Sequence, residues 1–213
     1  MTSTQAAANR LKGLYAITDD QLINRQQFSQ AIESALQGGA KIIQYRDKSN
    51  DQQKRFQQAT ILRTLCQQYQ ATSIINDDIE LAKAVAADGV HLGKNDASLT
   101  RARQLLGDKA IIGVSCYNEL RLALEAEKNR ANYVAFGAIF SSSTKPNAVV
   151  AGLDIIAAAK QQLSIPVCTI GGITDKNIPQ VVKQGADMAA VISSLFSAHD
   201  IKHTAQNLSQ YFN

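Results

Sequence analysis

Short apolar runs alternate with longer amphipathic segments along almost the whole chain, and this pattern predicts strands that alternate with helices. The apolar runs are rich in Ile, Val and Ala, and most of them stop at glycine or at a polar residue. They predict strands at 13–17, 41–45, 72–76, 89–92, 110–114, 132–136, 166–170 and 187–191. The segments between them predict helices at Gln27–Gln37, Gln52–Tyr69, Ile79–Ala86, Leu99–Leu106, Glu119–Lys128, Leu153–Gln162, Lys176–Lys183 and His199–Tyr211.

The junction between a helix and the following strand recurs in one form. A helical segment ends near glycine, as at Gly89 and Gly185, and an apolar run begins within a few residues. Strands that alternate with helices form a parallel sheet with right-handed crossovers. Eight such units predict a single (β/α)8 TIM barrel, an α/β fold, over residues 1–213, with 1–12 as a polar N-terminal extension. A doubly wound open sheet is the alternative, disfavoured because no G-x-G-x-x-G motif follows the first strand.

The composition is that of one folded domain without an extreme of charge. Hydrophobic residues make up 45% and charged residues 19% of the 213 residues, and the formal net charge is +4. No run of like charges is present, so a nucleic-acid partner is not indicated. The first thirteen residues lack the apolar region of a secretory signal. No stretch approaches eighteen consecutive apolar residues, so no membrane partner is expected. Three scattered cysteines, Cys66, Cys116 and Cys168, fit a reducing compartment, and we expect a cytoplasmic protein whose oligomeric state the sequence does not indicate.

Basic side chains follow the second predicted strand. The carboxyl ends of parallel strands meet at one rim of a barrel, where enzymes of this fold place their chemistry. Gln44, Arg46 and Lys48 lie two residues apart, so in extended backbone all three share one face. Arg46 offers a planar fork for a phosphate, and Lys48 offers a point charge. A solvated charged loop is the alternative, but the shared face and the buried run before it favour a binding site.

Carboxylates follow the third and fourth predicted strands. Asn76-Asp77-Asp78 closes the third strand, and Asp96 lies in the loop after the fourth. Oxygen ligands without sulfur or paired histidines suit Mg²⁺, which binds one or two carboxylates together with substrate phosphates. Helix capping is the alternative. We expect Asp78 to cap the helix that follows it and Asp77 to be the metal candidate, whereas Asp96 fits either role.

Later loops carry candidate phosphate ligands. Ser115 follows the fifth predicted strand, where a turn is the simpler interpretation of its hydroxyl group. The long 138–151 loop carries three hydroxyl side chains and a lysine, at Ser142, Ser143, Thr144 and Lys145. Such a loop can surround a phosphate, with a merely flexible Ser-rich loop as the alternative. Gly171-Gly172 and Ile192-Ser193 follow the seventh and eighth strands, where barrels often bind phosphate through backbone N–H groups.

The histidines do not indicate a catalyst or a zinc site. His91 lies within a predicted strand, and we interpret it as an interior residue with satisfied hydrogen bonds. His199 and His203 lie near the start of the last helix, away from the strand ends, and no Cys/His cluster with zinc-ligand spacing is present.

The ordered set of these segments resembles the thiamine phosphate synthase (thiamine-phosphate pyrophosphorylase) family over about Leu14–Leu195. The segments that carry the resemblance are Gln44–Lys48, Ile75–Asp78, His91–Gly93, Asp96, Gly113–Ser115, Ser142–Lys145, Gly171–Ile173 and Val191–Ser193. The resemblance implies a (β/α)8 barrel and a transferase that depends on Mg²⁺. The family joins 4-amino-5-hydroxymethyl-2-methylpyrimidine diphosphate to hydroxyethylthiazole phosphate, giving thiamine phosphate and diphosphate. Its reaction is a dissociative substitution, in which diphosphate leaves before the thiazole nitrogen attacks.

Residue by residue, the resemblance implies two substrate sites and one Mg²⁺ per active site. The pyrimidine diphosphate would contact Gln44, Tyr45, Arg46, Asp47, Lys48, Asn76, Ser115 and Lys145. The thiazole phosphate would contact Ser142, Ser143, Thr144, Gly172, Ile192 and Ser193. The Mg²⁺ would bind Asp77 and Asp96. The catalytic residues would be Arg46, Lys48, Lys145 and Ser115.

Two positions depart from the family pattern. The family usually has Glu where this chain has Asp47, and Pro-Thr where it has Ser141-Ser142. Serine keeps the hydroxyl group, and we expect the loss of proline to loosen the start of the loop. Two other functions stay open. A thiazole tautomerase-like paralogue would keep the phosphate loops without the set of cations and carboxylates, and a non-catalytic phosphate-ligand-binding barrel would bind without turnover.

Overall fold

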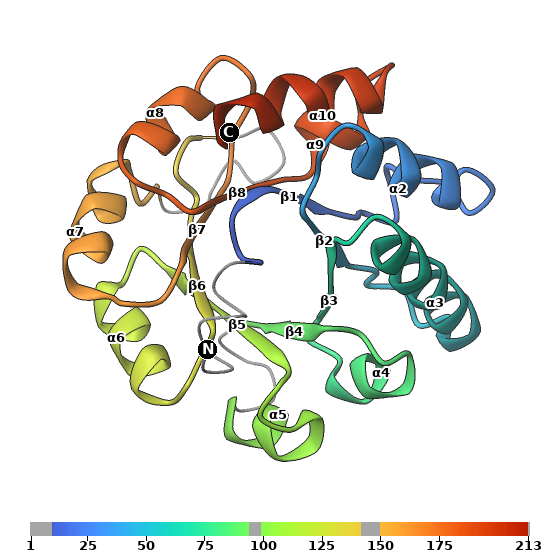
Figure 1. Ribbon diagram of the computed structural model, residues 1–213, viewed down its shortest axis with the longest axis horizontal. Helices are drawn as coiled ribbons and strands as arrows, with labels where there is room; N and C mark the ends of the chain where they lie inside the picture. Colours follow the sequence, from blue (N-terminus) through green and yellow to red (C-terminus); the bar gives the residue numbers. More distant parts are fainter. Residues whose placement is uncertain (1–9, 94–98, 142–149, 213) are drawn as a thin grey trace.

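Eight parallel strands close into a barrel in the order in which they occur in the chain (Figure 1). The structure is a computed structural model that describes residues 10–93, 99–141 and 150–212. The strands are β1 (Gly13–Ile17), β2 (Ile42–Tyr45), β3 (Thr72–Asn76), β4 (Gly89–Leu92), β5 (Ile111–Tyr117), β6 (Tyr133–Phe136), β7 (Val167–Ile170) and β8 (Met188–Val191). The barrel closes where β1 pairs with β8, with Gly13 beside Met188. The predicted (β/α)8 barrel is therefore confirmed, and the open sheet is excluded.

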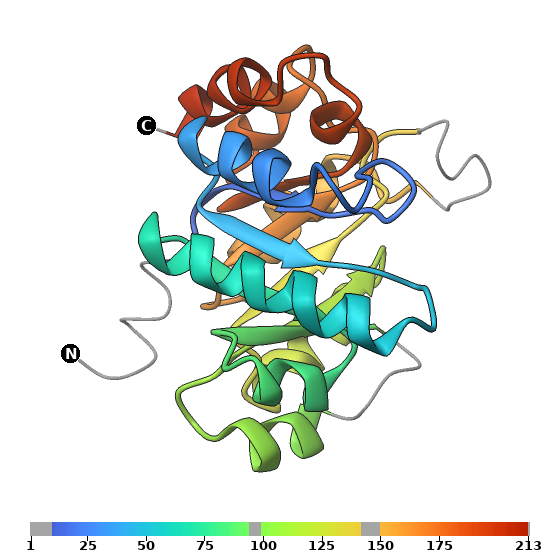
Figure 2. The same ribbon diagram turned by 90° about the vertical axis from the view of Figure 1, so that its right-hand side faces the viewer.

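Helices surround the barrel and cover the outer face of its strands (Figure 1). They are α2 (Phe28–Gln37), α3 (Gln52–Gln68), α4 (Ile79–Ala84), α5 (Leu99–Leu106), α6 (Leu120–Lys128), α7 (Asp154–Gln162), α8 (Ile178–Lys183), α9 (Ser193–Phe196), α10 (Ile201–Ser209) and the 3-10 helix η1 (Gln210–Phe212). Figure 2 shows α2 (blue) and α3 (blue-green) side by side on one flank. Within the described residues, none of these helices combines the length and apolarity needed to cross a membrane.

Several helices begin where a carboxylate caps the first turn. Asp51 accepts a hydrogen bond from Lys54 N at the start of α3, and Asp78 accepts one from Leu81 N at the start of α4. Such caps satisfy backbone N–H groups that have no partner inside the helix. The predicted capping role of Asp78 is confirmed, so this carboxylate belongs to the scaffold.

The strands separate two apolar cores, because successive side chains point to opposite faces. Tyr15 and Ile17 of β1 point into the barrel and join an inner core. Leu14 and Ala16 point outward and pack under the helices in a larger outer core. The inner core is smaller than the outer one, and the buried polar side chains of Gln44 and His91 lie beside it. The same alternation places Gln44 of β2 inside the barrel and Tyr45 under the helices.

Strand β5 extends further than the sequence pattern predicts. The prediction ended the strand at residue 114, whereas the strand continues to Tyr117 and shifts its register beside β6 between Ser115 and Tyr117. A bulge of this kind turns one side chain away from its regular direction. Ser115 thus lies within a strand, and its interpretation as a turn residue is wrong.

Candidate active site

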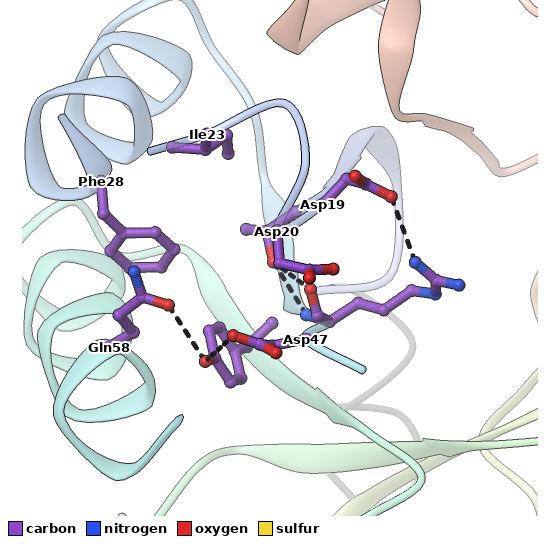
Figure 3. A pocket seen from close by; sticks show the side chains of 9 residues that line it. Asp19, Asp20, Ile23, Phe28, Asp47 and Gln58 are labelled. Atoms are coloured by element: carbon purple, nitrogen blue, oxygen red, sulfur yellow. Dashed lines mark hydrogen bonds and ion pairs between the residues drawn. The ribbon is translucent and has the colours of Figure 1, made fainter. Parts of the chain in front are cut away.

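Arg46 is fixed at the carboxyl rim by the end of β1. The Thr18 hydroxyl accepts a hydrogen bond from Arg46 N at 2.8 Å and donates one to Arg46 O at 3.1 Å. The guanidinium group of Arg46 lies 3.2 Å from the Asp19 carboxylate. Arg46 and Asp19 line a small pocket together with Phe28 and Gln58, and Figure 3 shows Asp19, Phe28 and Gln58 around it. Two neighbouring strands therefore hold one cation in a defined position.

Tyr45 and Asp47 lie on the opposite face of the same segment, under the helices. The Tyr45 hydroxyl is 3.1 Å from Gln58 Oε1, and the Asp47 carboxylate is 2.8 Å from Lys54 Nζ. Burial alone would raise the pKa of Asp47, but hydrogen bonds from Lys54 and Ser49 outweigh it and lower the pKa. Both residues line the same small pocket as Arg46, but in the described part of the chain neither side chain has a hydrogen bond to Gln44, Arg46 or Lys48. Their geometry is that of a support for the segment between β2 and α3.

Lys48, Asn76 and Asp77 meet at the end of β3. Lys48 Nζ and Asn76 Nδ2 both contact Asp77 Oδ2. Asp77 has a left-handed backbone with φ of 64°, and its N–H donates to His91 O at 2.9 Å. Aspartate tolerates this conformation better than most residues. Asp96, the second predicted metal ligand, lies outside the described residues, which contain no group of three or more His, Cys, Asp or Glu side chains able to hold a metal.

A row of hydrogen bonds crosses the barrel interior below the rim. Gln44 Nε2 donates to the Tyr15 hydroxyl at 2.7 Å, which lies 2.8 Å from the Tyr133 hydroxyl. The Tyr133 hydroxyl lies 2.9 Å from His91 Nδ1, and His91 Nε2 lies 2.9 Å from Ser115 Oγ. Both ring nitrogens of His91 thus have partners, as expected for an interior histidine. The row joins Gln44 to Ser115, which were predicted separately as substrate contacts.

Burial disfavours charge on the groups in this row. Burial lowers the pKa of His91 to about 4, and the nearby Asp77 carboxylate only partly opposes that effect. Burial also raises the pKa of the Tyr15 and Tyr133 hydroxyls above their usual range. Uncharged groups in a dry interior keep their hydrogen bonds without the cost of a buried charge.

The loops after β6 and β7 run side by side. Ile139 N donates to Ile170 O at 2.9 Å, and Phe140 N donates to Gly171 O at 3.1 Å. Gly172 has φ of 65°, and a Cβ atom there would lie 2.7 Å from Ser141 O. Only glycine fits this position. The remaining predicted ligands of the loop after β6 lie outside the described residues, and they are Ser142, Ser143, Thr144 and Lys145.

The loop after β8 is very short. Ile192 precedes the single turn of α9, which starts at Ser193. Because β7 and β8 are paired neighbours, this turn and Gly172 follow adjacent strands. The three backbone positions predicted for the thiazole phosphate thus lie on one sector of the rim.

Thr18, Asp19, Tyr15 and Tyr133 belong to the site but were not predicted. Thr18 and Asp19 hold Arg46, and the two tyrosines link Gln44 to His91. The only signal for the tyrosines is a large polar aromatic at an inward strand position, which looks the same as a core residue in the sequence.

A family model for thiamine monophosphate synthase matches residues 14–195 of this chain. The chain belongs to this family. Thiamine-phosphate synthase from Nitrosococcus oceani is 49% identical over 205 residues, covering 96% of this chain and 94% of that protein. Thiamine-phosphate synthase from Thioalkalivibrio sulfidiphilus is 47% identical over 212 residues, covering 100% and 99%. The predicted family and its transferase activity in thiamine biosynthesis are confirmed.

Solved structures agree with this membership of the thiamine monophosphate synthase family. Thiamine phosphate pyrophosphorylase from Pyrococcus furiosus superposes with a TM-score of 0.87 at 36% identity, over 96% of each chain. A geranylgeranylglyceryl phosphate synthase from Thermoplasma acidophilum gives a TM-score of 0.72 at 16% identity, covering 100% of this chain and 98% of that one. The second likeness concerns the barrel fold alone.

Proposed function

We propose that the rim formed by β1, β2, β3 and β5 binds the pyrimidine diphosphate and promotes departure of its diphosphate. The bond between the methylene carbon and the diphosphate oxygen breaks, and its electron pair leaves with the diphosphate. The lone pair of the thiazole nitrogen then forms the new carbon–nitrogen bond, giving thiamine phosphate. The observation that carries this proposal is that Arg46, which contacts Asp19, and the Lys48–Asn76–Asp77 contacts follow the paired strands β2 and β3.

Arg46 and Lys48 are suited to the leaving group. Negative charge grows on the diphosphate as the bond breaks, and fixed positive groups stabilise that charge most in the transition state. Arg46 is already held by Thr18 and Asp19. Lys48 is 57% exposed and pairs with Asp77, so it can turn to a phosphate once a metal ion occupies the carboxylate.

Asp77 fits a magnesium ligand. Its carboxylate is 23% exposed at the rim and already attracts two positively polarised groups, from Lys48 and Asn76. We assign Mg²⁺ to Asp77 together with Asp96, an oxygen donor set of the kind that this ion prefers. When bound, Mg²⁺ would neutralise charge on the departing diphosphate.

The thiazole phosphate is assigned to the opposite sector of the rim. Backbone groups at Gly172, Ile192 and Ser193 would bind it together with Ser142, Ser143 and Thr144. Lys145 would reach the diphosphate from the same 138–151 loop. The adjacency of the loops after β6 and β7 supports this assignment. The proposed location of this chemistry is the cytoplasm, in keeping with three free, buried cysteine thiols.

No strong general base is needed for this reaction, because an aromatic nitrogen already carries a free electron pair. His91 fits this expectation, since its two ring nitrogens are engaged by Tyr133 and Ser115. Its part in the site is therefore structural rather than proton transfer to the thiazole.

The experiment is a turnover assay on the purified chain. With both heterocyclic phosphates and Mg²⁺, we expect equal amounts of diphosphate and thiamine phosphate, measured by a coupled phosphate assay and by chromatography. Omitting either substrate, or adding EDTA, should lower the rate by at least about a hundredfold.

Absence of product under the complete conditions would contradict the proposed function. Conversion of a thiazole carboxylate phosphate alone would support a tautomerase instead. Binding of both substrates without any turnover would support a non-catalytic barrel.

A further inference from the structure

Five side chains inside the barrel form one unbroken row of hydrogen bonds. In order they are Gln44, Tyr15, Tyr133, His91 and Ser115, with donor–acceptor distances of 2.7, 2.8, 2.9 and 2.9 Å. The row begins and ends at side chains that the proposed function assigns to the pyrimidine diphosphate. In the described part of the chain, the Gln44 amide oxygen accepts no hydrogen bond, and the Ser115 hydroxyl meets only His91. Both ends therefore keep an unused hydrogen-bonding position, at Gln44, which is 2% exposed, and at Ser115, which is partly exposed.

Two proton arrangements use every tyrosine and imidazole proton within this row. Each tyrosine hydroxyl carries one proton, and a neutral imidazole donates through one ring nitrogen and accepts through the other. Any mixed arrangement leaves a tyrosine proton without an acceptor in the buried interior, which costs free energy, so the direction of one bond favours the same direction at every bond. In one arrangement Ser115 has a free proton and Gln44 presents its amide oxygen. In the other arrangement Ser115 presents only lone pairs and Gln44 presents its NH2 group.

An anion at Ser115 selects the first arrangement, because an ionised phosphate oxygen accepts hydrogen bonds and does not donate them. The Ser115 hydroxyl then accepts from His91 Nε2, and His91 Nδ1 accepts from Tyr133. Tyr133 in turn accepts from Tyr15, which accepts from the Gln44 NH2 group. This agrees with the orientation of the Gln44 amide, whose nitrogen faces Tyr15.

We propose that this row is a polarity relay: diphosphate binding at Ser115 sets the direction of every hydrogen bond, so that Gln44 presents an acceptor to the amino group of the pyrimidine. Tyr15, Tyr133 and His91 are then positioning residues that connect recognition of the anion to recognition of the amine. The inference rests on the proposed function, which supplies both groups in one substrate.

The surroundings of the relay keep its direction fixed. Tyr15 is 1%, Tyr133 0% and His91 8% exposed, so water has little access to the central bonds. The imidazole of His91 stacks on the Tyr133 ring with 5.6 Å between centroids, and the two tyrosine rings meet edge to face at 6.1 Å. Tight packing holds side chains in one rotamer. A relay in a wet or loose site would lose this coupling.

The test compares two substrates that differ only at the position Gln44 reads. One is the aminopyrimidine diphosphate, and the other carries a ring carbonyl in place of the amine. We expect Tyr133→Phe to lower the ratio of kcat/KM for the amino over the oxo substrate by at least about tenfold. Without the Tyr133 hydroxyl, the Gln44 amide can turn and serve either substrate. The intrinsic reactivity difference between the substrates cancels, because it is the same in both enzymes.

A second comparison tests the whole length of the relay. Ser115→Ala removes the hydroxyl group through which the relay contacts the diphosphate. Introduced into the wild type, it should lower the ratio of kcat/KM for the amino over the oxo substrate by about fivefold or more. In the Tyr133→Phe background, Ser115→Ala should leave the ratio unchanged within about twofold, since the ends are already disconnected.

Thr169→Val is the matched control. It removes a buried hydroxyl from β7 that donates to Met188 O and takes no part in the relay. Its ratio should equal that of the wild type. Tyr15→Phe breaks the relay at a different bond and replaces Tyr133→Phe if that variant does not fold, as judged by circular dichroism.

The inference is overturned if Tyr133→Phe and Tyr15→Phe slow both substrates by the same factor, because that is what a merely structural role predicts. An inactive wild type would instead contradict the proposed function. In that event, the dissociation constants of the amino and oxo diphosphates are measured by calorimetry. Their ratio in the wild type and in the variants then tests the relay without turnover.

Discussion

One hydroxyl group holds the backbone of Arg46 at the rim. Thr18 both accepts from Arg46 N and donates to Arg46 O, so it joins the end of β1 to the segment after β2 through a single side chain. It is 2% exposed, and its two bonds are therefore shielded from competing water. The position of Arg46 thus depends on a residue that carries no charge.

Gly113 gives a prediction at this scale. A Cβ atom at Gly113 would lie 2.0 Å from Cζ of Tyr133 and 2.4 Å from its hydroxyl oxygen. Gly113→Ala should therefore displace the Tyr133 ring and lower the free energy of unfolding by about 1–3 kcal/mol, measured by urea denaturation.

The double variant Gly113→Ala/Tyr133→Leu tests the cause of that loss. Leucine removes the clashing ring atoms, so the double variant should be at least about 1 kcal/mol more stable than the sum of the two single effects. Strict additivity would mean that Gly113 acts through its backbone and not through Tyr133.

Residue patterns predicted the side chains that follow the strands directly, but not the residues of β1 and β6 that contact them. Gln44 and Arg46 follow a strand at alternate positions, so their common face can be read from spacing. Tyr15 and Tyr133 are remote in sequence and look like core aromatics, and their meeting depends on barrel closure. Asp47 was linked to the diphosphate by resemblance, while its side chain packs against Lys54; that contact prediction stays a prediction.

Strands and helices were predicted more fully than the site, because each barrel unit repeats one local pattern. Strand ends lay within a residue of the prediction except in β5, where the bulge after Ser115 extends the strand. The short helix α9 (Ser193–Phe196) was not predicted, since four residues are too few to display helical periodicity. Local sequence patterns thus predict most strands and helices, whereas irregular features such as the β5 bulge depend on contacts between distant residues.

The junction between β2 and α3 gives a pH-dependent prediction. The folded-state pKa of Asp47 is lowered, so its contribution to stability is present above the unfolded pKa near 3.8 and is lost as the pH falls through the folded value. Asp47→Asn should cost about 1–3 kcal/mol at pH 7, and the difference from wild type should shrink as the pH falls below about 4.

Urea denaturation of both proteins across this pH range measures the difference. Asp51→Asn on the same helix is the control, because asparagine caps a helix as well as aspartate does. It should stay within about 0.5 kcal/mol of wild type at pH 7. If the difference in free energy of unfolding between Asp47→Asn and wild type does not change with pH, the charge of the Asp47 carboxylate does not cause it.

At the scale of the whole molecule, the proposed site draws on both halves of the barrel. In our assignment the diphosphate sector uses β1, β2, β3 and β5, whereas the thiazole phosphate sector uses the loops after β6, β7 and β8. Ligands that bind only the folded barrel must raise its melting temperature by mass action. A rise in melting temperature on adding a ligand therefore shows that the folded barrel binds that ligand.

Diphosphate and Mg²⁺ should stabilise the barrel together and not separately. With both present at about a hundred times their dissociation constant, the gain is about 2.7 kcal/mol, or about 5–11 °C in melting temperature. Asp77→Asn should abolish the gain, as measured by scanning calorimetry. Asp200→Asn, at the cap of α10 and away from the rim, should keep it. An equal gain from diphosphate alone would contradict the metal assignment.

Closure of the barrel by β1 and β8 also has a consequence for biosynthesis. Gly13 pairs with Met188, so the first strand waits unpaired on one side until almost the entire polypeptide has left the ribosome. The contact between Tyr15 of β1 and Tyr133 of β6 joins distant parts of the chain, so we expect it to form together with this seam. A truncated chain that ends before β8 keeps Arg46 and Lys48 but lacks the strand that joins β1 to β7, and we expect it not to form the proposed binding surface.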